Sequence, residues 1–330
     1  MWQTLSSCFR ELNDRVGAGW NRFWYAPADP LPLCALRVVA GLFALAWCGS
    51  YSQDLLRWFG PDGLLPIETV QGVLADETGR VRFYDASYWN LVTVPGQMWL
   101  VHGLGLAVLL CFTIGWRTRV SSVLALVVVL AYVHRAPMIS GLMTPLLAPL
   151  IAYLCVGPAG ACLSVDRWLC LRRSAARTGV ERDPSRPSHA ARVALRLVQV
   201  HLCGFCLLMG LTRLGGATWW RGDAIWWLAA QSDSRLVDVT FVRDWPLLIN
   251  AATHAVVLIE LLLVVLVWNR IARPLVLAVA AGVWLLLALL TGQVGFFALW
   301  LAAHLAFAEP QTVRRLLALA GHHVPAVEPG

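Results

Sequence analysis

Long apolar segments alternate with shorter polar ones along most of the chain. Several of them approach 20 residues with at most one charged side chain, which is the length of α-helix that crosses about 30 Å of hydrocarbon. About eight candidate helices follow, near residues 33–51, 96–115, 120–133, 143–156, 193–214, 246–268, 274–290 and 292–308. The last two are separated by a short Thr-Gly-Gln break and form either a hairpin or one kinked segment. The pattern predicts an all-α polytopic membrane helix bundle of about seven to eight transmembrane helices.

Composition agrees with this fold class and excludes several functions. Hydrophobic residues make up 58% of the 330 residues and charged residues 14%, which is too apolar for an ordinary soluble domain. The net charge of +7 does not indicate nucleic acid, because the basic residues cluster in one loop and around helix ends. All 26 basic residues are arginine, so a lysine base or a P-loop lysine is excluded. The nine cysteines are odd in number and lie mostly in apolar segments, which is typical of reduced thiols.

The distribution of arginine predicts the orientation. With eight spans, the loops and tails on one side hold 16 arginines and those on the other side hold 8. By the positive-inside rule, both termini of this multi-pass cell-membrane protein are expected in the cytoplasm. The partner that this composition requires is the lipid bilayer, and no protein partner is indicated.

The polar segments suggest the domain organisation. Residues 1–30 are expected to form an amphipathic cytoplasmic segment, without a cleavable signal peptide, and residues 310–330 a short cytoplasmic tail. The transmembrane domain occupies 31–309, and its Arg-, Ser- and Pro-rich loop 166–192 is expected to be a flexible cytoplasmic linker. On the outer side, loops 52–95 and 212–245 are expected to form a lid or vestibule, the first with a turn or short hairpin near Thr78-Gly79.

Ionisable residues inside the predicted spans are candidates for function, because burying charge in lipid is costly. Glu260 and His201 each lie about eight residues from the cytoplasmic ends of adjacent, oppositely directed helices, at a depth of roughly 12 Å. A contact between them, with Gln199 nearby, is therefore expected. This intramembrane polar core is either an interhelical clasp or a proton relay or ligand site.

The stretch GLTRLGGATWWRGDAIWW (residues 210–227) follows the fifth span. Its tryptophans are either interfacial anchors or, together with the charged residues between them, the rim of a site for a quinone-like or anionic ligand. The candidate rim consists of Arg213, Trp219, Trp220, Arg221 and Asp223.

Histidines and cysteines in the spans suggest two weaker sites. His102, His134 and His254 fall in the outer halves of their helices, but their spacing is not a local metal motif, so no metal site is predicted. Cys203 and Cys206 have redox spacing, although packing in a helix interface explains the pair as well.

Taken in order, several segments resemble the HTTM (horizontally transferred transmembrane domain) family, whose membrane domain is shared with vitamin K-dependent gamma-carboxylase. The resemblance covers about residues 31–309. It is carried by the segments CALRVVAGLFALAW, WFGPDGLLP, TIGWRTRVSSVLA, LCVGPAGACLSVDRW, LRLVQVHLCGFCLLMGLTRLGGATWWRGDAIWW, LIELLL and GQVGFFALWLAAHLAF.

The resemblance implies the fold. The departures from the family pattern argue against the carboxylation reaction. In the carboxylase branch, a lysine in a Gly-x-x-Lys element is taken as the base that deprotonates vitamin K hydroquinone, and this position is Arg213 here. A guanidinium stays protonated and is a poor base. The family histidine after the third helix has no match, since His134 is about two residues out of register with Ala136. The position of the family histidine in the seventh helix falls near Trp284 or Leu285, so this histidine is also missing.

Two classes of function follow. In the first, the chain is a non-carboxylating membrane module that binds a quinone or other lipid, or a protein partner. In the second, it is a divergent carboxylase-like, quinone-oxidising membrane enzyme with Arg213 in place of the catalytic lysine. Transport is less favoured, because no internal repeats are apparent.

Overall fold

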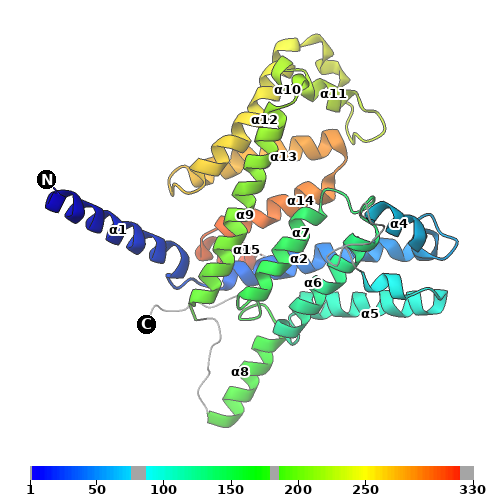
Figure 1. The fold of residues 1–330 in the computed structure, drawn as a ribbon, viewed down its shortest axis with the longest axis horizontal. Helices are drawn as coiled ribbons and strands as arrows, with labels where there is room; N and C mark the ends of the chain where they lie inside the picture. The colour runs from blue at the N-terminus through cyan, green and yellow to red at the C-terminus, as the bar shows by residue number, and fades with distance from the viewer. Residues whose placement is uncertain (1, 76–86, 179–185, 320–330) are drawn as a thin grey trace. The chain divides into compact units, whose positions relative to one another are not determined.

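The structure is a computed structural model that describes residues 2–75, 87–178 and 186–319 (Figure 1). Regular structure in these residues is mainly helical, and Ala28 and Ser188 form an isolated β-bridge. Within the described ranges, six helices are long and apolar enough to cross a membrane, and two shorter apolar helices accompany them. The predicted all-α polytopic bundle is confirmed. The turn or hairpin predicted near Thr78-Gly79 lies outside the described residues.

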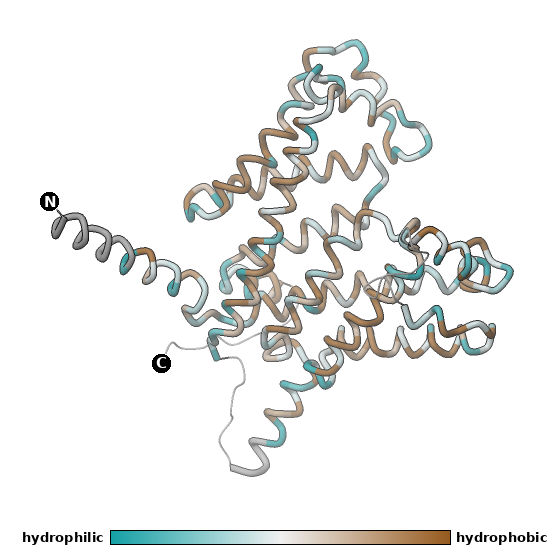
Figure 2. The backbone as a smooth tube through the Cα atoms, in the orientation of Figure 1, coloured by the Kyte–Doolittle hydropathy of each residue, from teal (hydrophilic) through white to brown (hydrophobic). Residues whose placement is uncertain are grey.

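Every predicted span corresponds to an apolar helix. They are α2 (Leu31–Ser50), α5 (Pro95–Ile114), α6 (Thr118–Arg135), α7 (Thr144–Val156), α9 (His189–Leu214), α12 (Pro246–Leu266), α13 (Arg273–Thr291) and α14 (Val294–Ala303). Five of them, α2, α5, α7, α12 and α13, carry proline in the first turn, where a missing backbone N–H costs nothing. Figure 2 shows apolar residues along these helices and polar residues in the connections.

The last two predicted spans are separate helices. Gly292 has φ +67° and ends α13, a left-handed conformation that glycine adopts at little cost. After this turn α14 packs against α13, and the 3-10 turn η5 (His304–Phe307) extends it. Of the two alternatives that the sequence allowed, the structure adopts the hairpin.

The segment expected to be a flexible linker, 166–192, is helical in its first part. Helix α8 (Val165–Thr178) occupies it, and α9 begins at His189. Asp166 lies in the first turn of α8, where a carboxylate is favoured by the helix dipole. The Arg172 guanidinium lies 3.9 Å from the centre of the Trp168 ring. The high content of charged residues suggested a linker and did not reveal this amphipathic helix.

The chain divides into two compact units, whereas the sequence reading placed residues 31–309 in one domain. The first unit comprises residues 1–197 and 308–330, and the second comprises residues 198–307. In the first, α2 packs against α5 and α7, and α6 packs against α5 and α7. It also contains α1 (Trp2–Tyr25), α3 (Leu55–Phe59), α4 (Ile67–Leu74) and α15 (Pro310–Leu319).

The turn between α5 and α6 is held by residues far away in the sequence. Gly115 ends α5 with φ +72°, and its backbone packs directly on the buried Arg37 side chain. Asp166 accepts hydrogen bonds from the Arg117 and Thr118 backbone N–H groups at 2.8 and 2.7 Å. It therefore caps the N-terminus of α6 from another part of the chain.

The second unit is built on α12 and α13, with α14 packed against α13. Two short helices, α10 (Ala217–Arg221) and α11 (Ala224–Ala230), pack against α12. Trp284, Trp300 and His304 form an aromatic cluster between α13, α14 and η5, with ring centres 4.6 to 5.8 Å apart. This framework positions the candidate site.

Candidate functional site

Two glycines redirect the chain at the end of α9. Helix α9 ends at Leu214, Gly215 and Gly216 follow, and α10 then returns the chain toward α12. Gly222 ends α10 with φ +77°, and a Cβ there would lie 1.9 Å from the Asn250 amide nitrogen. Glycine is favoured here because of the positive φ, and a side chain would also displace the Asn250 amide. The Trp219-Trp220 pair is thereby placed beside the apolar face of α12.

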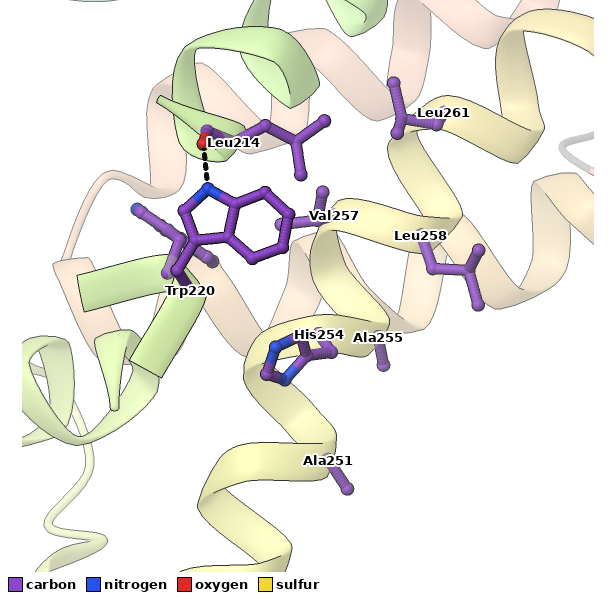
Figure 3. A pocket seen from close by; sticks show the side chains of 9 residues that line it. Leu214, Trp220, Ala251, His254, Ala255, Val257, Leu258 and Leu261 are labelled. Carbon is purple, nitrogen blue, oxygen red and sulfur yellow. Dashed lines mark hydrogen bonds between the residues drawn. The ribbon is translucent and has the colours of Figure 1, made fainter. Parts of the chain in front are cut away.

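An apolar groove of about 490 Å³ lies between this tryptophan pair and α12 (Figure 3). We call it the Trp219/Trp220 groove. It is open along α12, where Ala251, His254, Ala255 and Leu258 are exposed. Its lining consists of Leu214, Trp219, Trp220, Ala251, His254, Ala255, Val257, Leu258 and Leu261.

The few polar groups of the groove have defined roles. The Trp220 indole N–H donates a hydrogen bond to the Leu214 carbonyl, which fixes the ring against the end of α9 (Figure 3). His254 Nδ1 lies 2.9 Å from the Asn250 carbonyl oxygen of its own helix. With the proton on Nδ1, Nε2 of a neutral imidazole is a hydrogen-bond acceptor. The groove thus offers aromatic surface and one acceptor.

A buried ion pair lies behind the tryptophans. The Arg213 guanidinium pairs with the Glu260 carboxylate, and their side chains are 13% and 2% exposed. The guanidinium carbon lies 4.8 Å from the centre of the Trp219 ring, a cation–π distance. Trp219 therefore joins the ion pair to the groove.

The intramembrane polar core expected from the sequence is not assembled. Glu260 packs at the level of Gly210 on α9, and His201 is nine residues, or roughly 13 Å, further along that helix. A direct Glu260–His201 contact is therefore wrong, and Glu260 pairs with Arg213 instead. Gln199 donates to the Ala306 carbonyl at 2.7 Å, and the His201 ring lies beside Phe205. Counting from helix ends failed, because such a count ignores the axial offset between helices.

The predicted rim is divided between two pockets. Trp219 and Trp220 line the Trp219/Trp220 groove, with Arg213 behind them. Arg221 and Asp223 pair with each other at 3.1 Å and line a second, more polar pocket of about 440 Å³. The other lining residues of that pocket are Gly222, Trp226, Arg243, Pro246, Ile249 and Asn250.

Sequence reasoning missed the contribution of α12 to the groove. Ala251, His254, Ala255, Leu258 and Leu261 recur at the three- and four-residue spacing of one helix face. That spacing was visible in the sequence, but in a helix that is apolar on all sides it does not stand out. Of the two residues of α12 that the sequence singled out, His254 lines the groove, whereas Glu260 lies behind it and pairs with Arg213.

The remaining candidates lie elsewhere. His102 belongs to the first unit and contacts Ser52 and Tyr132. In the described ranges, no group of three or more His, Cys, Asp or Glu side chains is arranged to hold a metal ion. Cys203 and Cys206 are buried free thiols, and their assignment to helix packing stays a prediction.

No family model, curated protein or solved structure matches this chain.

Proposed function

We propose that the second unit binds a quinone or a similar ring-bearing lipid of the bilayer in the Trp219/Trp220 groove. The observation that carries this proposal is the groove itself, which is apolar and walled by two indole rings. Its volume of about 490 Å³ falls in the usual range for small-molecule sites. A groove of this size has room for a quinone ring and the first part of an isoprenoid tail.

The polar groups support a quinone-like head. A hydroquinone hydroxyl can donate to His254 Nε2, while the flat ring stacks on Trp219 or Trp220. The exposed residues along α12 leave the groove open from the side, as access from a bilayer requires. A phosphate head would find no cation in the groove lining, which favours a neutral ring.

We further propose that this module does not carboxylate. Arg213, the position that the HTTM resemblance aligns with the catalytic lysine, is held in the ion pair with Glu260. A guanidinium in that pair stays charged and does not remove a proton from a hydroquinone. The HTTM relationship itself stays a proposal, supported by the order of the apolar helices and by the turn motifs.

Binding is tested by titrating a short-chain naphthoquinone into the purified full-length protein in nanodiscs, with tryptophan fluorescence quenching as the signal. We expect Trp220→Ala to weaken binding about tenfold, equivalent to about 1.4 kcal/mol. Trp227→Ala is the matched control, because Trp227 is also exposed but does not line the groove. Equal affinity in both variants would contradict the proposed site. Extraction that recovers bulk phospholipid and no quinone would contradict the ligand class.

The enzymatic alternative predicts a different result. Epoxide formation from vitamin K hydroquinone in membranes, lost in Arg213→Ala, would mean that Arg213 stabilises an oxyanion in a divergent carboxylase-like enzyme. We expect no epoxide above empty membranes, because the position of the base is occupied by a paired cation.

A further inference from the structure

Three side chains of the first unit form a hydrogen-bonded chain that the proposed function does not use. Ser52 lies in η1 (Tyr51–Gln53), directly after α2, His102 on α5 and Tyr132 on α6. Ser52 Oγ is 2.7 Å from His102 Nε2. His102 Nδ1 is 2.5 Å from the Tyr132 hydroxyl. Both ring nitrogens of one imidazole are thus engaged by hydroxyl groups.

The chain runs from a buried end to a partly exposed one. His102 and Tyr132 are 2% and 1% exposed, whereas Ser52 is only half-buried. A reagent from outside therefore meets the serine hydroxyl first. The imidazole behind it is shielded from water, and its two ring nitrogens face the two hydroxyl groups.

Aromatic packing fixes the orientation of the histidine. The Tyr132 ring stacks on Tyr51 with centres 5.6 Å apart and an interplanar angle of 12°. Phe59 and Trp89 pack against Tyr132 in T-shaped geometry, with ring centres 6.1 and 5.1 Å from that of Tyr132. Because Tyr132 cannot swing away, its hydroxyl holds His102 in one ring position. This arrangement of nucleophile, base and orienting group is the one that activates serine in covalent catalysis.

The proton positions are consistent with that chemistry. When His102 Nδ1–H donates to the Tyr132 oxygen, Nε2 is unprotonated and accepts the Ser52 hydroxyl proton. Attack by Oγ on an ester carbonyl then forms the Oγ–C bond as the proton passes to Nε2. The ester C–O bond breaks, and the departing alcohol takes that proton. Water hydrolyses the acyl-serine by the reverse proton transfers, so atoms and charges balance.

We propose that Ser52 is an activated nucleophile toward ester-type substrates, with His102 as its general base and Tyr132 as a positioning residue. Its substrate class is an acyl ester of an amphiphile that reaches the end of α2. A neutral tyrosine stabilises an imidazolium less than a carboxylate does, so the expected reactivity is below that of a full Ser-His-Asp triad. The site lies in a different unit from the Trp219/Trp220 groove and is independent of it.

An alkyl fluorophosphonate tests the nucleophile directly on the full-length protein in nanodiscs. Ser52 Oγ displaces fluoride from phosphorus and loses its proton to His102, which leaves a stable phosphonate ester. We expect peptide mass spectrometry to locate the adduct on Ser52. Ser50 is the internal control, because its exposed hydroxyl donates to the Trp47 carbonyl. Ser50→Ala should label like the wild type and Ser52→Ala should not.

Two further variants separate activation from simple exposure. His102→Gln should label at least about 100-fold more slowly, the usual contribution of a general base. Tyr132→Phe keeps the ring and removes the hydroxyl, so a slowing of about tenfold or less is expected, with a modestly lowered melting temperature because the buried His102 Nδ1 loses its partner. If His102→Gln does not fold, the wild-type protein tests the proposal by itself, because the adduct must then lie on Ser52. An unlabelled wild-type Ser52, or equal rates in the wild type and His102→Gln, would overturn the proposal.

Discussion

Buried arginines of this lysine-free chain contact different partners. Arg213 pairs with the Glu260 carboxylate. Arg135, 1% exposed, donates to the Leu65 carbonyl at 2.6 Å and lies 5.5 Å from the Phe59 ring centre. Arg37, fully buried, donates to the Leu163 carbonyl. Arginine suits these roles because its guanidinium is flat, weakly hydrated and rich in donors.

The Arg213–Glu260 pair gives a prediction for the free energy of unfolding. Arg213→Ala leaves the buried Glu260 carboxylate without its cation, and such a loss costs about 3–5 kcal/mol. Arg221→Ala removes the exposed partner of Asp223, whose side chains are 59% and 36% exposed, and should cost less than about 1 kcal/mol. Thermal unfolding in detergent measures both.

A double variant tests the physical cause. Arg213→Met with Glu260→Leu replaces both charges by apolar groups and should recover most of the stability, because no unpaired charge remains. If the double variant lost as much free energy of unfolding as Arg213→Met and Glu260→Leu lose together, the unpaired charge would not be the cause of the destabilisation.

At the scale of elements, the α5–α6 turn depends on the left-handed backbone conformation of Gly115. Gly115→Ala forces a residue with a Cβ into φ +72° and brings that Cβ 1.9 Å from an Arg37 guanidinium nitrogen. A left-handed alanine costs about 1–2 kcal/mol, and displacing the buried Arg37 side chain about 1–3 kcal/mol more. We expect a lower melting temperature. Gly103→Ala on α5 is the matched control, because its Cβ meets nothing within 4 Å; a melting temperature lowered equally in both would contradict the prediction.

For the whole molecule, the orientation in the membrane stays a prediction, and cysteine labelling tests it. Cys170 on α8 is half-buried, so a membrane-impermeant maleimide should label it in inside-out vesicles and not in intact cells. Cys170→Ser should abolish that signal in a Cys8→Ser background. The hydrogen bond to Cys34, together with burial, raises the pKa of the Cys162 thiol, so Cys162 should stay unlabelled because the thiolate is the reactive form.

A second position reports the opposite side. Ser232→Cys, in the exposed segment after α11, should label in intact cells if loop 212–245 faces outward. Labelling of Cys170 from outside and of Ser232→Cys only from inside would reverse the orientation inferred from arginine.

The sequence by itself determined the class of fold and the approximate position of each long helix. Apolar length is a local property, and first-turn prolines such as Pro95 and Pro246 mark where the helices begin. The resemblance and the tryptophan-rich stretch also pointed to Arg213, Trp219 and Trp220, which the structure gathers at one end of α9 and along α10.

Only the tertiary structure decided which polar groups meet. Glu260 faces Arg213 and not His201, and Ser52, His102 and Tyr132 converge from three helices. These contacts depend on the rotation and axial offset of each helix. Lipid tails are as apolar as a protein core, so the inward and outward faces of a membrane helix carry similar residues. For that reason hydropathy locates the helices along the chain but does not indicate which side of each one faces its neighbours.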